Sequence, residues 1–311
     1  MGVKELTDLA IDPATGDYVY TSLKISHTSG MAIPTGYTKL NTLDLSNNAY
    51  GGGAGATTIL ADLVVIPSLT DLNLASNNIG LVQLPTLPVL QQFNLSSNVL
   101  AATPPLASLP SLTSLDLSFN KISEVGTLGQ AAKLAKLVLR GNALTSTKGI
   151  GACSSLRTLD VGANQLTSLD DLSTLVALAT LTVSSNQLTT LAGVESLPSL
   201  TTLDAGANQL ADVAAAAALA SVETLRAITI AGGGGDEEGA PPPNPLCDAD
   251  NLKVELLALR PTLVAVDGEA LLNAEKEEAS ALRAERAEAA AAAAAEAAAA
   301  EAAEEAGAAA E

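Results

Sequence analysis

One eleven-residue pattern recurs along this 311-residue chain and constrains its fold more than any other feature. In each copy, apolar residues occupy the first, fourth, sixth and eleventh positions, and asparagine occupies the ninth. From Leu90 to Leu200 the copies begin 22 residues apart every time. The asparagines in phase are Asn48, Asn77, Asn98, Asn120, Asn142, Asn164, Asn186 and Asn208. Constant spacing with an asparagine in phase indicates a tandem array of one structural unit.

The physics of this unit follows from its period. The alternating Leu-x-Leu segment predicts a short strand with its leucines facing inward, and successive strands stack as a parallel sheet. Each asparagine amide is expected to bond backbone groups of neighbouring turns and so form a ladder. Apolar residues spaced three apart in the return half, such as Leu169, Leu172 and Leu175, suit short 3₁₀ turns.

These features predict an α/β leucine-rich-repeat solenoid. We expect a parallel sheet on its concave face, short 3₁₀ or helical turns on its convex face, a C-terminal cap and a helical tail. Because no repeat buries its leucines alone, neighbouring repeats must cover them. This also explains why 48% of the chain is hydrophobic but only 2% aromatic. A thin, regular prism has slots for branched aliphatic side chains and little space for rings.

The array divides the chain into four parts. Residues 1–39 are expected to hold an N-terminal cap and a degenerate first repeat, residues 40–230 the repeats, residues 231–267 a Gly/Pro loop and C-terminal cap, and residues 268–311 an Ala/Glu-rich tail. A strand is predicted at Leu225, Ile228 and Ile230, after which an asparagine would be due at position 233. Glycine stands there instead, and a Gly/Pro-rich acidic insert follows.

The tail changes composition abruptly. Residues 268–311 hold 11 acidic and 3 basic side chains, and alanine and glutamate are strong helix formers. Two interpretations stay open: a solvated, partly frayed helix or simple disorder, or a helix that docks along a neighbour in a larger assembly. Its bulky apolar residues are Leu271, Leu272 and Leu282, so docking would begin near the cap.

The charge balance excludes several partners. The chain has 34 acidic and 15 basic residues, a net charge of −19. This charge repels phosphate backbones, so we expect neither nucleic-acid nor anionic-membrane binding. No run of apolar residues is long enough for a membrane span, and no secretory signal is visible at the start. We therefore expect a cytoplasmic protein.

Residues suited to catalysis are almost absent. His27 is the single histidine, and the glycine clusters lack the lysine of a phosphate-binding loop. Cys153 and Cys247 lie far apart, which suggests a reducing compartment. We expect Cys153 in the core and Cys247 partly exposed. The sequence thus predicts a protein that is not an enzyme and needs neither cofactor nor metal.

The concave face is the candidate protein-binding surface. The candidate residues are Asp116, Phe119, Lys136, Arg140, Arg157, Asp160 and Asp204. The aspartates recur at outward strand positions, and they could equally serve only to solvate that face. Phe119 beside a basic spot is typical of an interface hot spot. The alternative is that Phe119 packs into the asparagine turns.

Two motifs carry a resemblance to a known family. LRGNALTSTKGI at residues 139–150, and Asn244-Pro245-Leu246-Cys247 followed by a Pro-x-Leu-x-x-Val-Asp ending, are similar to the leucine-rich-repeat protein of ciliary radial spokes. The 22-residue class also resembles the Sds22-like phosphatase regulators, the spliceosomal U2 A-prime type and the outer-arm dynein light chain. The alanine-rich low complexity is similar to that of green-algal proteins.

The resemblance implies a structural, non-enzymatic subunit of the motile-cilium axoneme, most simply a radial spoke component. Its partners would be other radial spoke or axonemal proteins, bound through the solenoid surface in a large assembly. Its location would be the cytoplasmic axoneme of the cilium or flagellum. The alternative function is a regulatory leucine-rich-repeat module that binds a phosphatase or a dynein subunit.

Overall fold

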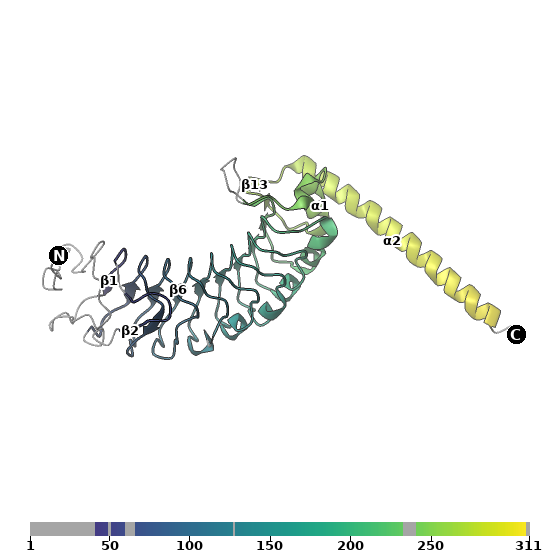
Figure 1. Ribbon diagram of the computed structural model, residues 1–311. Coiled ribbons are helices and arrows are strands. Elements are labelled where there is room, and N and C mark those ends of the chain that lie inside the picture. The colour runs from purple at the N-terminus through teal and green to yellow at the C-terminus, as the bar shows by residue number, and fades with distance from the viewer. Residues whose placement is uncertain (1–40, 49–50, 60–65, 127, 233–240, 309–311) are drawn as a thin grey trace.

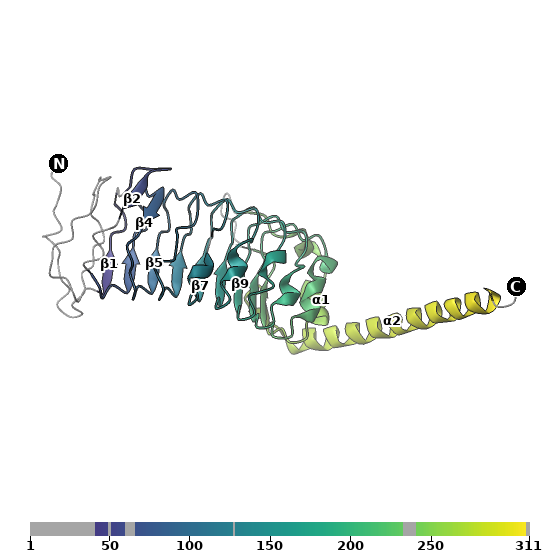
Figure 2. The ribbon, with the colours of Figure 1, turned by 90° about the horizontal axis from the view of Figure 1, so that it is seen from below.

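The computed structural model is a curved solenoid with a long helix projecting from its C-terminal end (Figure 1). It describes residues 41–48, 51–59, 66–126, 128–232 and 241–308. The predicted N-terminal cap at residues 1–39, with His27, lies outside the described residues. Within them, the predicted leucine-rich-repeat solenoid is confirmed: one strand per repeat, stacked in sequence order (Figure 2).

An eleven-stranded sheet forms the concave face. Its strands are, in order, β1 (Thr42–Asp44), β3 (Asp71–Asn73), β5 (Gln92–Asn94), β6 (Ser114–Asp116), β7 (Lys136–Val138), β8 (Thr158–Asp160), β9 (Thr180–Thr182), β10 (Thr202–Asp204), β11 (Ala227–Thr229), β12 (Ala265–Val266) and β13 (Glu269–Ala270). Neighbouring strands are parallel from β1 to β12, and β13 pairs antiparallel with β12. The register places equivalent residues of successive repeats side by side, such as Leu159 beside Leu181.

Stacked aliphatic side chains form the core. The middle residue of each repeat strand points inward and is buried, such as Leu159 in β8, and so are Leu156 before that strand and Val161 after it. Phe93 is the one aromatic among the buried core residues that the structure describes. Each fully buried leucine contributes roughly 1.5–3 kcal/mol by removing apolar surface from water. The one-dimensional stack thus replaces a globular core.

The asparagine ladder has the predicted form. The Asn164 side chain donates to the carbonyl oxygens of Leu139 and Val161, both at 3.0 Å, and accepts from the Leu144 N–H at 3.0 Å. Equivalent bonds recur along the array, for example at Asn98 and Asn186. From Asn77 to Asn208, each asparagine therefore joins its own turn to the turn of the preceding repeat, whereas Asn48 donates within its own turn.

The ladder continues one step beyond its predicted end. Asn244 is 1% exposed; it donates to the carbonyl oxygens of Ala205 and Ile230 and accepts from the Leu210 N–H at 3.0 Å. These are the bonds that an asparagine at position 233 would make. The Gly/Pro segment is therefore an insertion inside the last repeat, and Asn244 restores the ladder after it.

The convex side differs between the two halves of the solenoid. From residue 128 onward it carries the predicted 3₁₀ segments: η3 (Leu128–Gln130), η4 (Ile150–Ala152), η5 (Asp170–Leu172), η6 (Val194–Ser196) and η7 (Val213–Ser221). In the first described repeats a second, two-stranded parallel sheet stands there instead, made of β2 (Thr57–Ile59) and β4 (Leu81–Gln83). The glycine loop before β2 packs closely on the next repeat, since a Cβ at Gly80 would lie 2.1 Å from the Gly53 oxygen.

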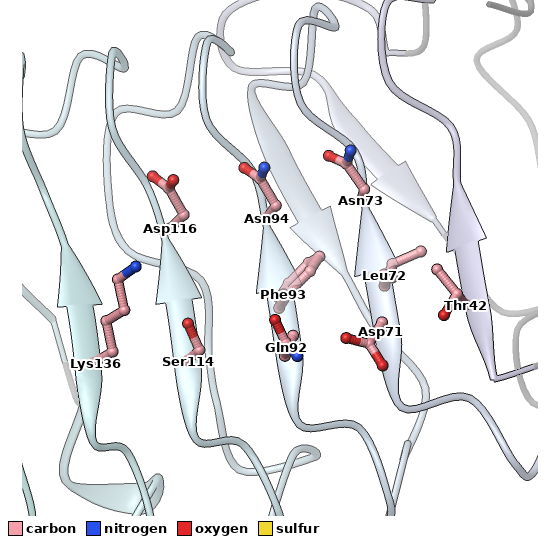
Figure 3. A pocket seen from close by; sticks show the side chains of 10 residues that line it. All are labelled: Thr42, Asp71, Leu72, Asn73, Gln92, Phe93, Asn94, Ser114, Asp116 and Lys136. Atoms are coloured by element: carbon pink, nitrogen blue, oxygen red, sulfur yellow. The ribbon is translucent and has the colours of Figure 1, made fainter. Parts of the chain in front are cut away.

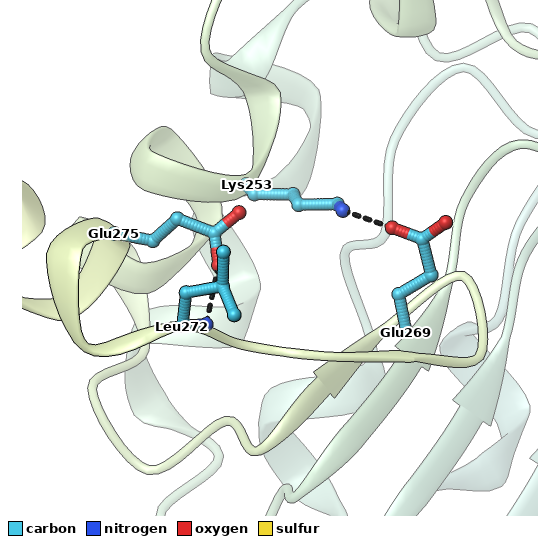
Figure 4. Close-up of polar contacts among 4 residues, drawn as sticks. All are labelled: Lys253, Glu269, Leu272 and Glu275. Carbon is cyan, nitrogen blue, oxygen red and sulfur yellow. Dashed lines mark hydrogen bonds and ion pairs between the residues drawn. The ribbon is translucent and has the colours of Figure 1, made fainter.

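The predicted C-terminal cap closes the sheet. It comprises η8 (Pro245–Asp248), α1 (Leu252–Leu259), β12 and β13. The Asp267 carboxylate accepts hydrogen bonds from the Ile230 and Ala231 N–H groups at 2.7 and 2.9 Å. It takes the place of the acceptors that a following repeat would offer to these groups. Lys253 and Glu269 form an ion pair across the cap (Figure 4).

The tail is a single helix, α2 (Asn273–Ala308), of 36 residues, about 54 Å long. Glu275 accepts from the Leu272 N–H at 2.6 Å and caps its first turn (Figure 4). Its start packs on α1: Ala279 is buried, Leu282 half-buried, and Arg286 pairs with Glu255 at 2.8 Å. Residues 283–298 are exposed and project away from the solenoid (Figures 1 and 2).

Candidate protein-binding surface

Carboxylates at the ends of the concave strands have a structural role. Asp116 and Asp160 each accept the N–H of the residue two positions later, at 2.9 Å, and Asp204 does so at 3.2 Å. Asn73 and Asn94 make the same bond at 3.1 and 2.9 Å. These side chains therefore fix the chain where it leaves the strand, a role that neither the binding nor the solvation hypothesis included.

The same turns leave polar atoms facing outward. The turn uses Oδ1 of each side chain, so the second terminal atom remains available to a partner. That atom is an oxygen acceptor in Asp116 and an amide donor in Asn73 and Asn94. The strand ends thus display an ordered row of acceptors and donors at the spacing of the sheet, about 4.8 Å.

A shallow hollow of about 290 Å³ lies on the first half of this face (Figure 3). Its lining residues are Thr42, Asp71, Leu72, Asn73, Gln92, Phe93, Asn94, Ser114, Asp116 and Lys136. The buried Leu72 and Phe93 form its floor, and polar side chains stand around it. Small-molecule sites are usually enclosed and mostly apolar, so this hollow suits the surface of another protein better.

Three basic residues lie next to each other in the repeat order: Lys136 begins β7, Arg140 follows β7 in its turn, and Arg157 immediately precedes β8. Lys136 and Arg157 are exposed and Arg140 is half-buried. In the part of the chain that the structure describes, ion pairs form only at Lys253–Glu269 and Arg286–Glu255, so all three cations remain available to a partner.

Asp160 stands among these charges. Burial raises the pKa of its carboxyl, and the charges of Asp204 and Asp116 raise it further. The Gly162 N–H and the Arg140 guanidinium act in the opposite direction. Arg140 also donates to the Ser184 hydroxyl at 3.5 Å, so it extends along the array across two repeats.

Phe119 projects from the turn after β6. Its backbone is left-handed, with φ of 53°, and the residue is 58% exposed. The ring contacts Gly141 in the following turn. Both sequence interpretations therefore describe part of its setting: the ring rests on the asparagine turns and still presents most of its surface to solvent.

The structure brings some predicted residues together and separates others. Asp116 and Lys136 line the hollow, whereas Asp204 lies on β10, beyond it. Asp71 and Gln92 also line the hollow and were missed as candidates. Comparing the first strand residue of every repeat would have found both, because that position always faces the concave side.

Groups suited to catalysis are scarce among the described residues. Burial raises the pKa of the Cys153 thiol to about 11, and Cys247 is half-buried with a raised pKa. No group of three or more His, Cys, Asp or Glu side chains is arranged to hold a metal within the described ranges. Nor does any helix in them have the length and apolar character needed to cross a bilayer.

Comparisons with known proteins agree with this architecture. Family models described as leucine-rich repeats match residues 154–210, and residues 65–82 and 108–126. The repeats and these partial matches define the fold class: a leucine-rich-repeat solenoid. No curated protein matches it in sequence.

Solved structures show the same fold. The functional domain of InlJ from Listeria monocytogenes superposes with a TM-score of 0.54 and 22% identity, covering 78% of this chain and 48% of that one. A leucine-rich-repeat protein of Leptospira interrogans gives 0.51 and 22%, covering 78% and 64%. This chain thus spans about half of InlJ's domain and under two thirds of the Leptospira protein, and at such identities the likeness shows the fold alone.

Proposed function

We propose that this protein is a non-enzymatic scaffold that binds another protein through its concave face. One observation carries the proposal: an eleven-stranded sheet presents an open, polar face whose groups are held in place by the turns. Asp116 and Lys136 stand on it with atoms available to a partner. Such pre-organised groups lower the entropic cost of association and favour protein recognition.

The assembly we propose is the axoneme of a motile cilium, with the protein as a radial spoke component that binds other spoke proteins. The family resemblance at residues 139–150 and at Asn244-Pro245-Leu246-Cys247 supports it. Both motifs have identifiable roles in the fold, since Asn142 and Asn244 are members of the ladder. The chain's partner-facing surface would then hold spoke subunits in fixed positions.

Co-extraction from isolated axonemes tests this proposal. The tagged chain is expressed in a motile, ciliated cell, axonemes are isolated and extracted with salt, and spoke subunits that co-purify are identified by mass spectrometry. We expect the chain to remain with the axoneme and co-purify with spoke subunits. A freely soluble chain that captures phosphatase activity would contradict the proposal and favour the regulatory alternative.

A matched pair of variants assigns the contact to the concave face. Arg140→Glu with Arg157→Glu reverses two charges of the basic spot, one in the turn after β7 and one immediately before β8. Lys133→Glu with Lys148→Glu makes the same change in net charge at exposed residues that belong to neither the concave strands nor their turns. We expect only the first pair to lose axonemal assembly. Equal assembly of both pairs would remove the basic spot from the interface.

A further inference from the structure

Phe119 occupies a position that the other repeats reserve for small residues. Each turn has one left-handed residue immediately before the ladder asparagine. In the other turns this residue is Asn47, Ser76, Ser97, Gly141, Ala163, Ser185 or Ala207. A left-handed backbone is unfavourable for a bulky side chain. Phe119 is 58% exposed, so burial of its ring does little to offset this conformational cost. Folding alone therefore does not explain a phenylalanine at this position.

The next repeat provides a seat for the ring. Gly141 occupies the same repeat position, 22 residues later. A Cβ at Gly141 would lie 2.7 Å from Cδ1 and 3.0 Å from Cε1 of Phe119. Any other residue would push the ring away, so glycine is what allows the ring to rest on the backbone with its other face open.

Arg140 repeats the same arrangement one position earlier in the turn. The corresponding residues elsewhere are Ser46, Ala75, Ser96, Ser118, Gly162, Ser184 and Gly206. Here too glycine follows in the next repeat: a Cβ at Gly162 would lie 2.5 Å from Arg140 Nη1. Two successive turns thus each carry one oversized side chain, and each is seated on a glycine.

We propose that Phe119 and Arg140 form a recognition platform for a partner segment in which an aromatic side chain lies next to a carboxylate. The open face of the Phe119 ring suits offset stacking of a second ring. The Arg140 guanidinium has donors in a planar fork that fits a carboxylate.

Arg140 forms no ion pair within the described residues, so its own charge favours an acidic segment. Lys136 is an exposed cation at the start of β7, the strand that precedes Arg140, and Asp160 and Asp116 are the carboxylates nearby. This platform deepens the proposed function, since it lies on the turns at the edge of the same concave surface.

Peptide titration of the full-length protein tests the platform. The probe is an acetylated, amidated Gly-Glu-Trp-Glu-Gly peptide, followed through the backbone amide signals of Gly141 and Gly162 by NMR. The charge control is Gly-Lys-Trp-Lys-Gly. We expect the acidic peptide to shift both glycine signals and to bind about fivefold more tightly than the basic one, in line with the size of a charge-assisted contact.

Serine variants separate recognition from folding. Serine occurs naturally at both repeat positions, so Phe119→Ser and Arg140→Ser should keep the solenoid intact, as thermal unfolding can verify. Each should weaken the acidic peptide about fivefold, as loss of an aromatic stack or a charged bond predicts. The platform would be overturned by any of three results. These are glycine signals that do not shift, equal affinities for the two peptides, and wild-type affinity for the acidic peptide in both serine variants.

The peptide and axoneme experiments can fail separately. If the acidic peptide does not bind at Phe119 and Arg140 while the Arg140 and Arg157 charge reversal still blocks assembly, the proposed platform is wrong and the proposed function stands. If the peptide binds the platform but the charge-reversed protein assembles normally in axonemes, the recognition chemistry stands and its assigned role in the assembly fails.

Discussion

Removal of one ladder side chain gives the sharpest test of how the solenoid is held together. In Asn164→Ala, the buried Leu144 N–H loses its acceptor, which now lies at 3.0 Å. The carbonyl oxygens of Leu139 and Val161 keep other partners, because Asn142 and Asn186 also donate to them. An unsatisfied buried donor costs about 1–3 kcal/mol and the lost donor bonds add about 1 kcal/mol. We therefore expect unfolding free energy to fall by about 3 kcal/mol.

Urea unfolding followed by circular dichroism measures this loss, and hydrogen exchange at the Leu144 amide localises it. The control is Gln165→Ala, which truncates the exposed amide next in sequence and should change stability by less than about 0.5 kcal/mol. A loss below about 1 kcal/mol for Asn164→Ala, with Leu144 protected as before, would refute the ladder as a source of stability.

A carboxylate at the same place adds a pH dependence. In Asn164→Asp, an oxygen replaces the amide that now donates to the Leu139 and Val161 carbonyls. Burial and these carbonyls would raise the pKa of the new carboxyl above its unfolded value. The protonated form is then favoured in the folded state, so stability should recover as pH falls through that raised pKa. A pH-independent loss relative to wild type would contradict this reasoning.

Other substitutions probe backbone strain and thiol burial. Phe119→Gly removes the left-handed strain, so thermal unfolding should show equal or higher stability; a loss above about 1 kcal/mol would mean that the ring supports the fold. Gly206→Ala should cost roughly 2 kcal/mol or more in urea unfolding, since its Cβ would lie 2.1 Å from the Gly232 Cα, whereas Gly162→Ala meets the movable Arg140 side chain and should cost less. In native protein at pH 8, Cys247 should react with maleimide faster than Cys153, whose pKa is about 11; equal rates by mass spectrometry would contradict the burial of Cys153.

Sequence reasoning predicted the repeated part of the fold well because each unit repeats the same contacts. The inward leucines, the ladder from Asn77 to Asn208 and the strand at Ala227–Thr229 follow from period alone. The extension of the ladder to Asn244 does not follow from the period, because the insertion breaks it. The β2–β4 sheet was missed because the convex side depends on how the glycine loop packs, which spacing does not encode.

The candidate surface was predicted less completely. The concave position of Asp116 and Lys136 followed from strand alternation, but their participation in a hollow depends on the curvature of the sheet. The seats under Phe119 and Arg140 involve glycines in the next repeat. They become visible in sequence only when whole repeats are aligned position by position, and their significance depends on contact distances that the alignment does not give.

Carboxyl footprinting of the chain within its assembled complex tests the central claim most directly. Carbodiimide labelling would compare Asp116, Asp160 and Asp204 on the concave strands with Asp170 and Glu195 on the 3₁₀ segments of the opposite side. If the concave face binds the partner, labelling of the strand aspartates falls on assembly while that of Asp170 and Glu195 stays constant. Protection confined to Asp170 and Glu195 would place the partner on the convex side and contradict the account.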